Sequence, residues 1–388
     1  MSHGQPEEQI FRNARIVLRD EVVTGSVRLR RGWIEEICPG PIATGHHRAG
    51  EDLEGDFLIP GLVELHTDHI EGHFLPRPRV RWNMTAAVQA HDNQIAASGI
   101  TTVFDALRVG EDENADFAPA DVGDLAQTIS DCVAEGRLRA DHFLHIRCEV
   151  SSPDVVDGFE RIGDNPLIRL ASLMDHAPGQ RQFVDPTAYK TYYQRKMKLS
   201  DAEFAEFSRR RLAESEENAD RNRIVLAARC HAAGISVASH DDATADHVAE
   251  AVRLGISLAE FPTTVEAARL SHAAGLKVLM GAPNIVRGGS HSGNIGAAGL
   301  LSAGVLDILS SDYVPFGLLQ AAFQLADEGL ADLPRAIRLV STNPAEATRL
   351  ADRGEIATGR RGDLVRVAAV PAKPPIVRCV WRAGNRVA

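Results

Sequence analysis

The chain has 388 residues, 44% of them hydrophobic, and carries a formal net charge of −11 at pH 7. This length is enough for one large barrel-type domain with its own buried core and a small accessory domain. The acidic balance excludes the basic footprint of a typical nucleic-acid-binding protein, so we expect no nucleic-acid partner. An acidic enzyme that binds a polyanion must instead concentrate positive charge locally, as a metal ion or as arginine.

The cysteines and the lengths of the apolar runs bear on location. The five cysteines are widely spaced, without a C-x-x-C pair, and their odd number favours a reducing cytosol over a disulfide framework. Residues 1–8 contain no apolar signal-peptide region. No apolar run approaches the ~18–20 residues of a membrane span. We therefore expect a cytoplasmic protein with no membrane partner.

Both ends of the chain have the pattern of short strands, separated by charged or glycine-containing turns. The segments with this pattern are residues 9–18, 22–30, 32–38, 362–369 and 376–387. Two β-rich ends around a different middle predict one small β-sandwich domain, built from residues 1–58 and 351–388.

The middle of the chain alternates between strand-like and helix-like stretches. Eight apolar runs of strand length are nearly continuous in hydrophobicity, as in parallel strands that are covered on both faces. They are residues 62–66, 101–106, 142–150, 168–174, 235–239, 256–261, 277–280 and 306–310. The helices between them have capping residues at Asn83, Ser200 with Glu203, Thr244, Thr264 and Asn343.

Eight alternations of this kind predict an α/β fold, a (β/α)₈ TIM-type barrel over residues 59–350. The rival is an open, doubly wound sheet. That fold would be supported by a G-x-G-x-x-G motif after the first strand, and none is present there.

The first apolar run follows a Pro60–Gly61 breaker and ends in His66-x-Asp68. Side chains two apart on a strand point the same way, so this imidazole and this carboxylate converge where the strand ends. In a TIM-type barrel the active site lies at the carboxyl ends of the strands. His69 and His73, which follow directly, are expected to line the next loop.

Other apolar runs also end in residues that can bind a metal. Imidazole nitrogens and carboxylate oxygens together suit a divalent metal of the zinc class. We predict one or two metal ions, zinc with manganese as the alternative. The predicted ligands are His66, Asp68, Glu149, His176 and His240, and Asp312 is the predicted general base.

Several of these residues have a structural alternative. Glu149 could instead pair with Arg147 or Arg169 inside the barrel, or bridge two metals. Asp105 ends the second run and is left off the ligand set as structural. Asp241 and Asp242 are interpreted as supporting carboxylates or as a helix cap ahead of Thr244, and His145 as a satisfied core histidine.

Residues 280–294, after the seventh run, combine glycines and serines with one arginine. Loops after strands seven and eight of such barrels often hold phosphate, and arginine binds phosphate oxygens in a bidentate manner. An ordinary surface loop is the alternative. The predicted substrate-binding residues are Asn284, Arg287, Ser290, His291 and Ser292 here, and Arg181 after the fourth run.

The first strand, Pro60-Gly-Leu-x-Glu-Leu-His-x-Asp68, and the split β-rich ends resemble the amidohydrolase superfamily. The superfamily's usual His-x-His is here His66-x-Asp68, and Glu149 occupies its usual carbamylated-lysine position. Long segments resemble the superfamily's hydrolases of phosphonate metabolism, in the carbon–phosphorus lyase pathway. They include residues 173–182, 238–244 and 278–294.

That resemblance implies release of diphosphate from a ribose 5-triphosphate in alkylphosphonate catabolism, with a small phosphorylated ribose as substrate. Composition and spacing alone lead only to a metal-dependent hydrolase of a phosphorylated substrate. The alternatives are an amide or cyclic-amide hydrolase of the same superfamily and a non-catalytic scaffold with a structural metal. Apolar helix faces permit a homodimer.

Overall fold

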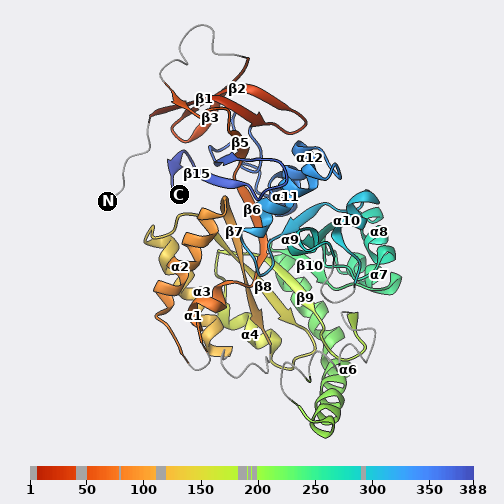
Figure 1. Ribbon diagram of the computed structural model, residues 1–388. Helices are drawn as coiled ribbons and strands as arrows, with labels where there is room; N and C mark the ends of the chain where they lie inside the picture. Colours follow the sequence, from red (N-terminus) through yellow and green to blue (C-terminus); the bar gives the residue numbers. More distant parts are fainter. Residues whose placement is uncertain are drawn as a thin grey trace.

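The computed structural model describes residues 7–40, 50–77, 80–110, 119–181, 190, 194, 199–289 and 294–388. Its larger sheet contains eight parallel strands, each hydrogen-bonded to the next (Figure 1). They are β6 (Leu62–Thr67), β7 (Ile100–Val109), β8 (Asp141–Glu149), β9 (Ile168–Met174), β10 (Ser236–His240), β11 (Leu258–Glu260), β12 (Lys277–Gly281) and β13 (Ile308–Ser310). All eight predicted apolar runs are strands.

The first and last of these strands meet just beyond their carboxyl ends. Thr67 and Asp312 form a parallel bridge. The backbone N–H of Asp68 donates to the carbonyl of Asp312, and the N–H of Asp312 donates to the carbonyl of His66, each at 3.1 Å. The sheet therefore curls round to its own first strand, which confirms the predicted (β/α)₈ barrel.

Helices cover the outside of the barrel (Figure 1). They are α1 (Ile70–Phe74), α2 (Met84–Ala97), α3 (Pro119–Ala134), α4 (Val155–Ile162), α6 (Asp201–Ala232), α7 (Ala245–Arg253), α8 (Val265–Ala273), α9 (Ala282–Val286), α10 (Ala297–Ser302), α11 (Gly317–Asp327), α12 (Leu333–Arg338) and α13 (Thr342–Ala347). None of the helices in these described ranges is long and apolar enough to cross a bilayer.

Most of the predicted helix starts are confirmed. Asn83, Thr244 and Thr264 accept capping bonds from backbone N–H groups, and Ser200 with Glu203 forms a reciprocal capping box. The predicted helix cap at Asn343 is wrong. Helix α13 begins at Thr342, because the Asn343 amide instead donates to the carbonyl of Asp307.

The second sheet joins strands from both ends of the chain, as predicted. Its order is β16-β15-β14-β5-β1-β2-β3, with β4 paired to β1. The strands are β1 (Glu8–Val17), β2 (Val22–Arg30), β3 (Trp33–Pro39), β4 (Glu51–Asp52), β5 (Phe57–Pro60), β14 (Leu364–Ala368), β15 (Ile376–Arg382) and β16 (Asn385–Arg386). The domain boundaries at 58/59 and 350/351 stay predictions.

Only Gly61 separates β5 of the small sheet from β6 of the barrel. A Cβ atom built at this position would lie 2.2 Å from the Thr101 hydroxyl oxygen. A side chain here would push β6 away from its neighbour β7. The Pro–Gly breaker therefore lets the chain pass from one sheet to the other in close contact with the barrel.

The inside of the barrel changes character along the strands. One residue on each of several strands belongs to a buried apolar cluster, including Leu170, Ala238, Leu258 and Ile308. Because side chains two apart share a face, the next inward residues toward the carboxyl ends are Ser172, His240, Glu260 and Ser310. An apolar floor thus supports a polar layer at the mouth of the barrel.

A partly buried cluster of opposite charges fastens the barrel to the small sheet. The Asp141 carboxylate, at the start of β8, lies 2.6 Å from Arg353, 2.6 Å from Arg361 and 3.1 Å from Arg382. Burial alone raises the pKa of Asp141, but the charges of these arginines outweigh burial and lower it.

We expect Asp141→Asn to destabilise the fold by about 2–3 kcal/mol at pH 7, because three arginines lose their shared anion. The expected loss of stability is smaller than for a fully buried ion pair, because 27% of the Asp141 side chain is exposed. Since folding lowers the pKa of Asp141 below its ordinary value of 3.8, its contribution to stability is present above that pH. The contribution is lost as the pH falls through the folded-state pKa.

Urea unfolding at pH 7 and at acidic pH measures this difference. The matched control is Asp220→Asn, whose side chain is 93% exposed. It should stay within about 0.5 kcal/mol of wild type. Equal stability of Asp141→Asn and wild type at pH 7 would contradict the role given to Asp141.

Candidate active site

A buried glutamate, Glu260, organises two histidines at the mouth of the barrel. Its Oε1 lies 3.1 Å from Nδ1 of His66 and its Oε2 3.1 Å from Nδ1 of His240. The Ser172 hydroxyl donates to Oε2 at 2.5 Å. Because a carboxylate only accepts hydrogen bonds, each neutral ring carries its proton on Nδ1 and keeps a lone pair on Nε2.

This environment favours positive charge at His66. Burial lowers the pKa of His66, but the Glu260 carboxylate outweighs it and raises that pKa to about 10. A proton or a metal ion can supply the charge, and the two compete for the same lone pair. The site thus has the carboxylate–histidine arrangement that orients metal ligands in proteins.

His176 and Asp241 complete this group. Nε2 of His176 lies 3.9 Å from Oδ2 of Asp241, and Nε2 of His240 lies 3.5 Å from the same oxygen. This Asp241 oxygen is buried without a hydrogen-bond partner. One donor atom from each of the three residues lies within 4.8 Å of the others. An unsatisfied carboxylate oxygen between two imidazoles suits a cation.

Glu149 lies behind His176. Its Oε2 is 2.6 Å from Nδ1 of His176 and accepts a 2.9 Å bond from Arg108. Its Oε1 accepts bonds from the Ser151 hydroxyl and the His176 backbone, and lies 3.5 Å from Arg211. Burial raises the pKa of Glu149, but the charges of His176 and Arg108 outweigh it and hold the pKa well below its usual value.

These contacts favour the ion-pair alternative for Glu149, with arginines other than those predicted. Both oxygens already have partners, and the side chain orients His176. Its assignment as a metal ligand stays a prediction.

Asp68, just after β6, is paired with a cation from β8, the next strand but one in the sheet. Both its oxygens lie 2.7 Å from Nη1 of Arg147 on β8. Asp68 Oδ1 also lies 3.6 Å from Nε2 of His66. Enclosure raises the pKa of Asp68, but the Arg147 charge outweighs it and holds the pKa well below its usual value. Asp68 therefore sits beside the predicted metal site while paired with arginine, and its role as ligand stays a prediction.

Asp312 follows β13 in a left-handed backbone conformation, with φ of 57°. Its carboxylate lies against Gly281, where an added Cβ atom would come within 3.5 Å of Oδ2. The bridge to Thr67 fixes its backbone beside the strand that carries His66. This position is compatible with the predicted general base, which remains a prediction.

The predicted phosphate-binding residues divide into four cases. Arg287 is exposed just after α9, and its guanidinium donates to the Tyr313 hydroxyl at 3.4 Å, next to Asp312. Asn284 has a buried carbonyl oxygen without a hydrogen-bond partner. Arg181 is buried and paired with two carboxylates, which counts against a role in binding phosphate. Ser290, His291 and Ser292 lie outside the described residues.

Three residues of this site were not predicted in these roles. Glu260 ends the sixth apolar run, and an acid inside such a run is a signal that could have identified it. Asp241 was interpreted as a supporting carboxylate. Arg147 shares a strand face with Glu149, two residues away, yet it pairs with Asp68. Nδ1 of His145 lies 2.9 Å from the Leu65 carbonyl oxygen, and its Nε2 lies beside the Ser172 hydroxyl oxygen.

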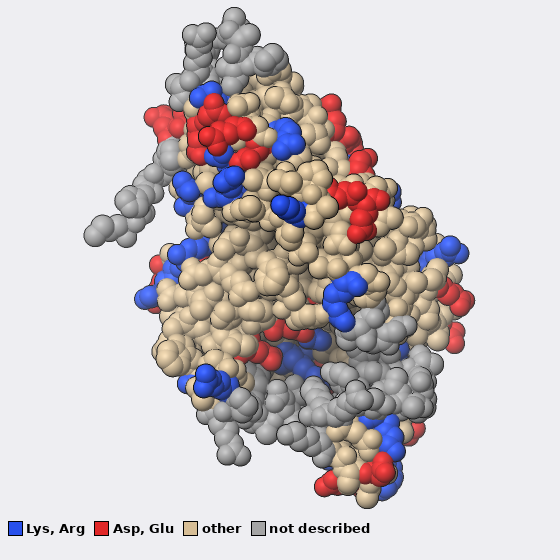
Figure 2. All heavy atoms as spheres, viewed as in Figure 1, with Lys and Arg blue, Asp and Glu red and all other residues tan. Residues whose placement is uncertain are grey.

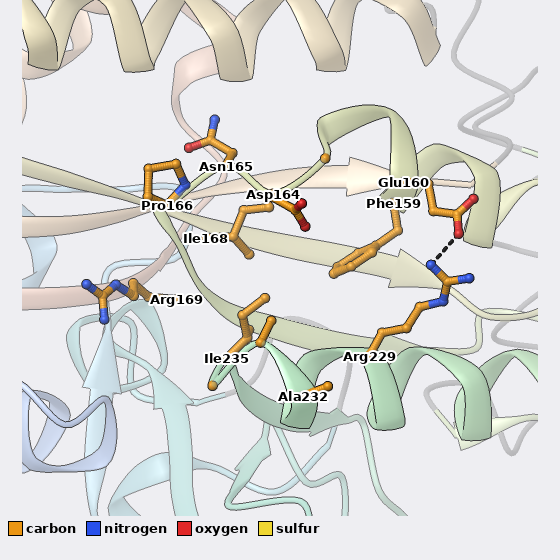
Figure 3. Close-up of a pocket in the computed structure, with 13 residues that line it drawn as sticks. Phe159, Glu160, Asp164, Asn165, Pro166, Ile168, Arg169, Arg229, Ala232 and Ile235 are labelled. Atoms are coloured by element: carbon orange, nitrogen blue, oxygen red, sulfur yellow. Dashed lines mark ion pairs between the residues drawn. The ribbon is translucent and has the colours of Figure 1, made fainter.

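Figure 2 shows acidic and basic side chains side by side in a hollow below the middle of the molecule. A separate cavity of about 690 Å³ lies between α4, α6 and the start of β9 (Figure 3). Phe159, Ile168 and Ile235 line it, and Glu160 pairs there with Arg229. Because Ile168 and Ile235 stand at the amino ends of their strands, this cavity lies away from the end that carries chemistry in such barrels.

Comparison with known proteins identifies the family. Residues 85–388 match the amidohydrolase family. The chain belongs to this family. It is 45% identical to α-D-ribose 1-methylphosphonate 5-triphosphate diphosphatase of Escherichia coli (strain K12), over 97% of this chain and 100% of that protein. The superfamily is metal-dependent, and the histidine–carboxylate groups above are candidates for the site.

Solved structures share the fold of this amidohydrolase at low identity. 5-Methylcytosine deaminase from Klebsiella pneumoniae has a TM-score of 0.66 at 16% identity and covers 98% of both chains. N-acetylglucosamine-6-phosphate deacetylase from Pasteurella multocida has a TM-score of 0.62 at 14% identity, covering 98% of this chain and 99% of that one. These likenesses show the fold alone.

We expect Glu260→Gln to weaken metal binding by roughly 10–100-fold, the usual effect of losing a carboxylate behind ligating histidines. The amide can accept from only one ring and presents its NH₂ group to the other. Competition with a chromogenic chelator measures the affinity. Glu328→Gln, at an exposed position, is the control and should bind metal as wild type does. Unchanged affinity in Glu260→Gln would remove Glu260 from the metal site.

Proposed function

We propose that this amidohydrolase hydrolyses α-D-ribose 1-methylphosphonate 5-triphosphate, releasing diphosphate and leaving the 5-monophosphate in alkylphosphonate catabolism. It is then a hydrolase of phosphorus-containing anhydrides. The observation that carries the proposal is the 45% identity to the diphosphatase of Escherichia coli, over 97% of this chain and the whole of that protein. The arrangement of donors at the barrel mouth supports it.

The residues that would hold a divalent metal are His66, His176, His240 and Asp241. The fit rests on the unpaired Oδ2 of Asp241 and on Glu260, which holds two rings by Nδ1. Three imidazoles and a carboxylate favour zinc, with manganese as the alternative. When bound, such a metal lowers the pKa of a water ligand and polarises a phosphoryl oxygen.

The arginine partners of the other two predicted ligands favour one metal over two. The negative charge of Asp68 is already balanced by Arg147, and that of Glu149 by Arg108 and Arg211. A second divalent ion at either carboxylate would have to displace or repel a buried guanidinium. Both residues thus act on the site mainly by position and charge.

The chain's own residues divide the remaining work. Asp312 accepts the proton of the attacking water. Water oxygen bonds to the α-phosphorus, and the bond from that phosphorus to the oxygen bridging it to the β-phosphorus breaks. Arg287, outside the barrel axis beside Tyr313, holds the departing β- and γ-phosphates. With the anion-binding arginine at the rim, the α-phosphorus is the one left at the barrel mouth.

The setting of the reaction is part of the proposal. We place the enzyme in the cytoplasm because all five cysteines are free thiols. Its partner is the small phosphorylated ribose, and neither nucleic acid nor membrane is required for the reaction. The homodimer stays a prediction.

Hydrolysis in ¹⁸O-water tests which bond breaks. In-line attack needs near-contact geometry, so the label marks the phosphorus that faces the attacking water. We expect ¹⁸O in the sugar-bound monophosphate and unlabelled diphosphate. Label confined to diphosphate or to orthophosphate would overturn this placement of the substrate. A parallel assay with an N-acyl amino acid should show no hydrolysis, and turnover there would favour the amide-hydrolase alternative.

Arg287→Ala should lower kcat/KM by roughly 10–100-fold, the range expected for loss of a charge-assisted bond. KM should rise because a phosphate contact is lost. The kcat should fall because negative charge grows on the leaving diphosphate in the transition state. Steady-state kinetics separates the two effects. Arg209→Ala, on the exposed side of α6, is the control. A change in KM alone would limit Arg287 to ground-state binding.

A further inference from the structure

Three histidines outside the predicted active site converge between α1 and α2. His69 precedes α1, His73 lies in its last turn, and His91 lies on α2. The two helices are neighbours in Figure 1. One ring nitrogen from each histidine lies within 4.8 Å of the other two. None of the three takes part in the site built on Glu260.

The arrangement leaves one donor atom unexplained. Nε2 of His91 lies 2.8 Å from Oδ1 of Asp105, whereas its Nδ1 is buried and has no hydrogen-bond partner. His91 is wholly buried. Because the Asp105 carboxylate only accepts, the His91 proton lies on Nε2 in the neutral ring and a lone pair remains on Nδ1. His91 belongs to the group with His69 and His73, and Nδ1 is its ring nitrogen without a partner.

A hydrogen bond alone does not account for the cluster. Nε2 of His73 lies 3.2 Å from Nδ1 of His69, so a proton shared between these rings satisfies two nitrogens. It leaves the buried Nδ1 of His91 unpaired, at a cost. A cation bound by one nitrogen of each ring, with Nδ1 of His91 among them, would give this buried atom a partner.

The distances and donor types fit a zinc-class ion. Two imidazoles bound to one tetrahedral zinc at about 2.0–2.1 Å place their nitrogens about 3.3–3.4 Å apart. The observed 3.2 Å between His69 and His73 is close to this value. His69 and His73 are four residues apart, at the start and in the last turn of α1. This i, i+4 spacing puts their side chains on the same face of the helix.

The support behind His91 is also typical of a metal ligand. Asp105 is buried and holds His91 on one oxygen and Nδ1 of His142, at 2.7 Å, on the other. The other ring nitrogen of His142 lies 3.2 Å from Asp92, and Asp92 accepts hydrogen bonds from the backbone N–H groups of Arg139 and Ala140. A carboxylate that fixes a histidine's tautomer and orientation in this way is the usual second partner of a ligating imidazole.

We propose that His69, His73 and His91 form a second, structural zinc site, separate from the active site, with water in the fourth position. The ion would tie the segment that follows Asp68 to α2. Its presence would hold the carboxyl end of β6 in place from outside the barrel. The proposal does not depend on the reaction proposed above.

Zinc counting tests it. The protein is saturated with zinc chloride, passed through a desalting column, and measured by elemental analysis. We expect His73→Gln and His69→Gln each to bind one zinc per chain fewer than wild type. His272→Gln, at a histidine far from both sites in the sequence and paired with Asp307 at the surface, should match wild type. Circular dichroism checks that each variant is folded.

A second variant keeps the test decisive if a change in α1 prevents folding. His240→Gln removes a ligand of the active site and should still retain one zinc per chain. If His240→Gln holds no zinc, or if His73→Gln and His69→Gln hold as much as wild type, the three-histidine site is refuted. Loss of turnover in His240→Gln with one zinc retained would separate the two sites.

Discussion

The site depends on the hydrogen bonds between the Glu260 carboxylate and two histidine rings. The carboxylate bonds His240 from the neighbouring strand β10 and His66 from β6. Strands β6 and β11 are not neighbours in the sheet, so this second bond crosses the mouth of the barrel. It can form only when β13 has returned to β6 and closed the ring. Folding of the whole barrel is therefore a condition for orienting the two imidazoles.

Burying such a carboxylate has a large desolvation cost, and it is stable only when its oxygens are fully bonded. Here Ser172 and two histidine rings supply the donors. The apolar residues one layer below, such as Leu258 and Leu170, keep water from the floor of the site. The same low-dielectric surroundings strengthen the attraction between Glu260 and positive charge on the histidines.

Sequence predicted the barrel well because parallel strands covered on both faces leave a clear signal, a run of apolar residues. It predicted the strand-end histidines for the same reason, since a polar residue stands out where such a run stops. It could not predict which carboxylate meets which cation. Arg147 reaches Asp68 and not Glu149, although Glu149 is two residues away, because the partner is set by strand tilt and closure.

Glu260 was missed for a related reason. The sixth predicted apolar run extends to Phe261, so its acidic residue was interpreted as part of a longer strand. In the structure β11 ends at Glu260, and Phe261 takes a left-handed conformation that turns the chain. His69 and His73 were likewise expected only to line a loop, and no role was predicted for His91. His69 and His73 lie at α1, whereas His91 lies on α2. Only the packing of α1 against α2 brings the three rings together.

The charges at the mouth of the barrel explain how an acidic protein can receive a triphosphate. Three carboxylates near the mouth are each paired with an arginine that is largely enclosed: Asp68, Glu149 and Asp242. These pairs hold the walls near neutrality, so the carboxylates repel the substrate less than their number suggests. They also engage these arginines, so a metal ion held by His176, His240 and Asp241, as proposed above, would be the main attraction for the reacting phosphoryl group. Under the proposed function, such a chain would depend on its metal for substrate binding as well as for chemistry, and Arg287 would act on the phosphates that lie farther out.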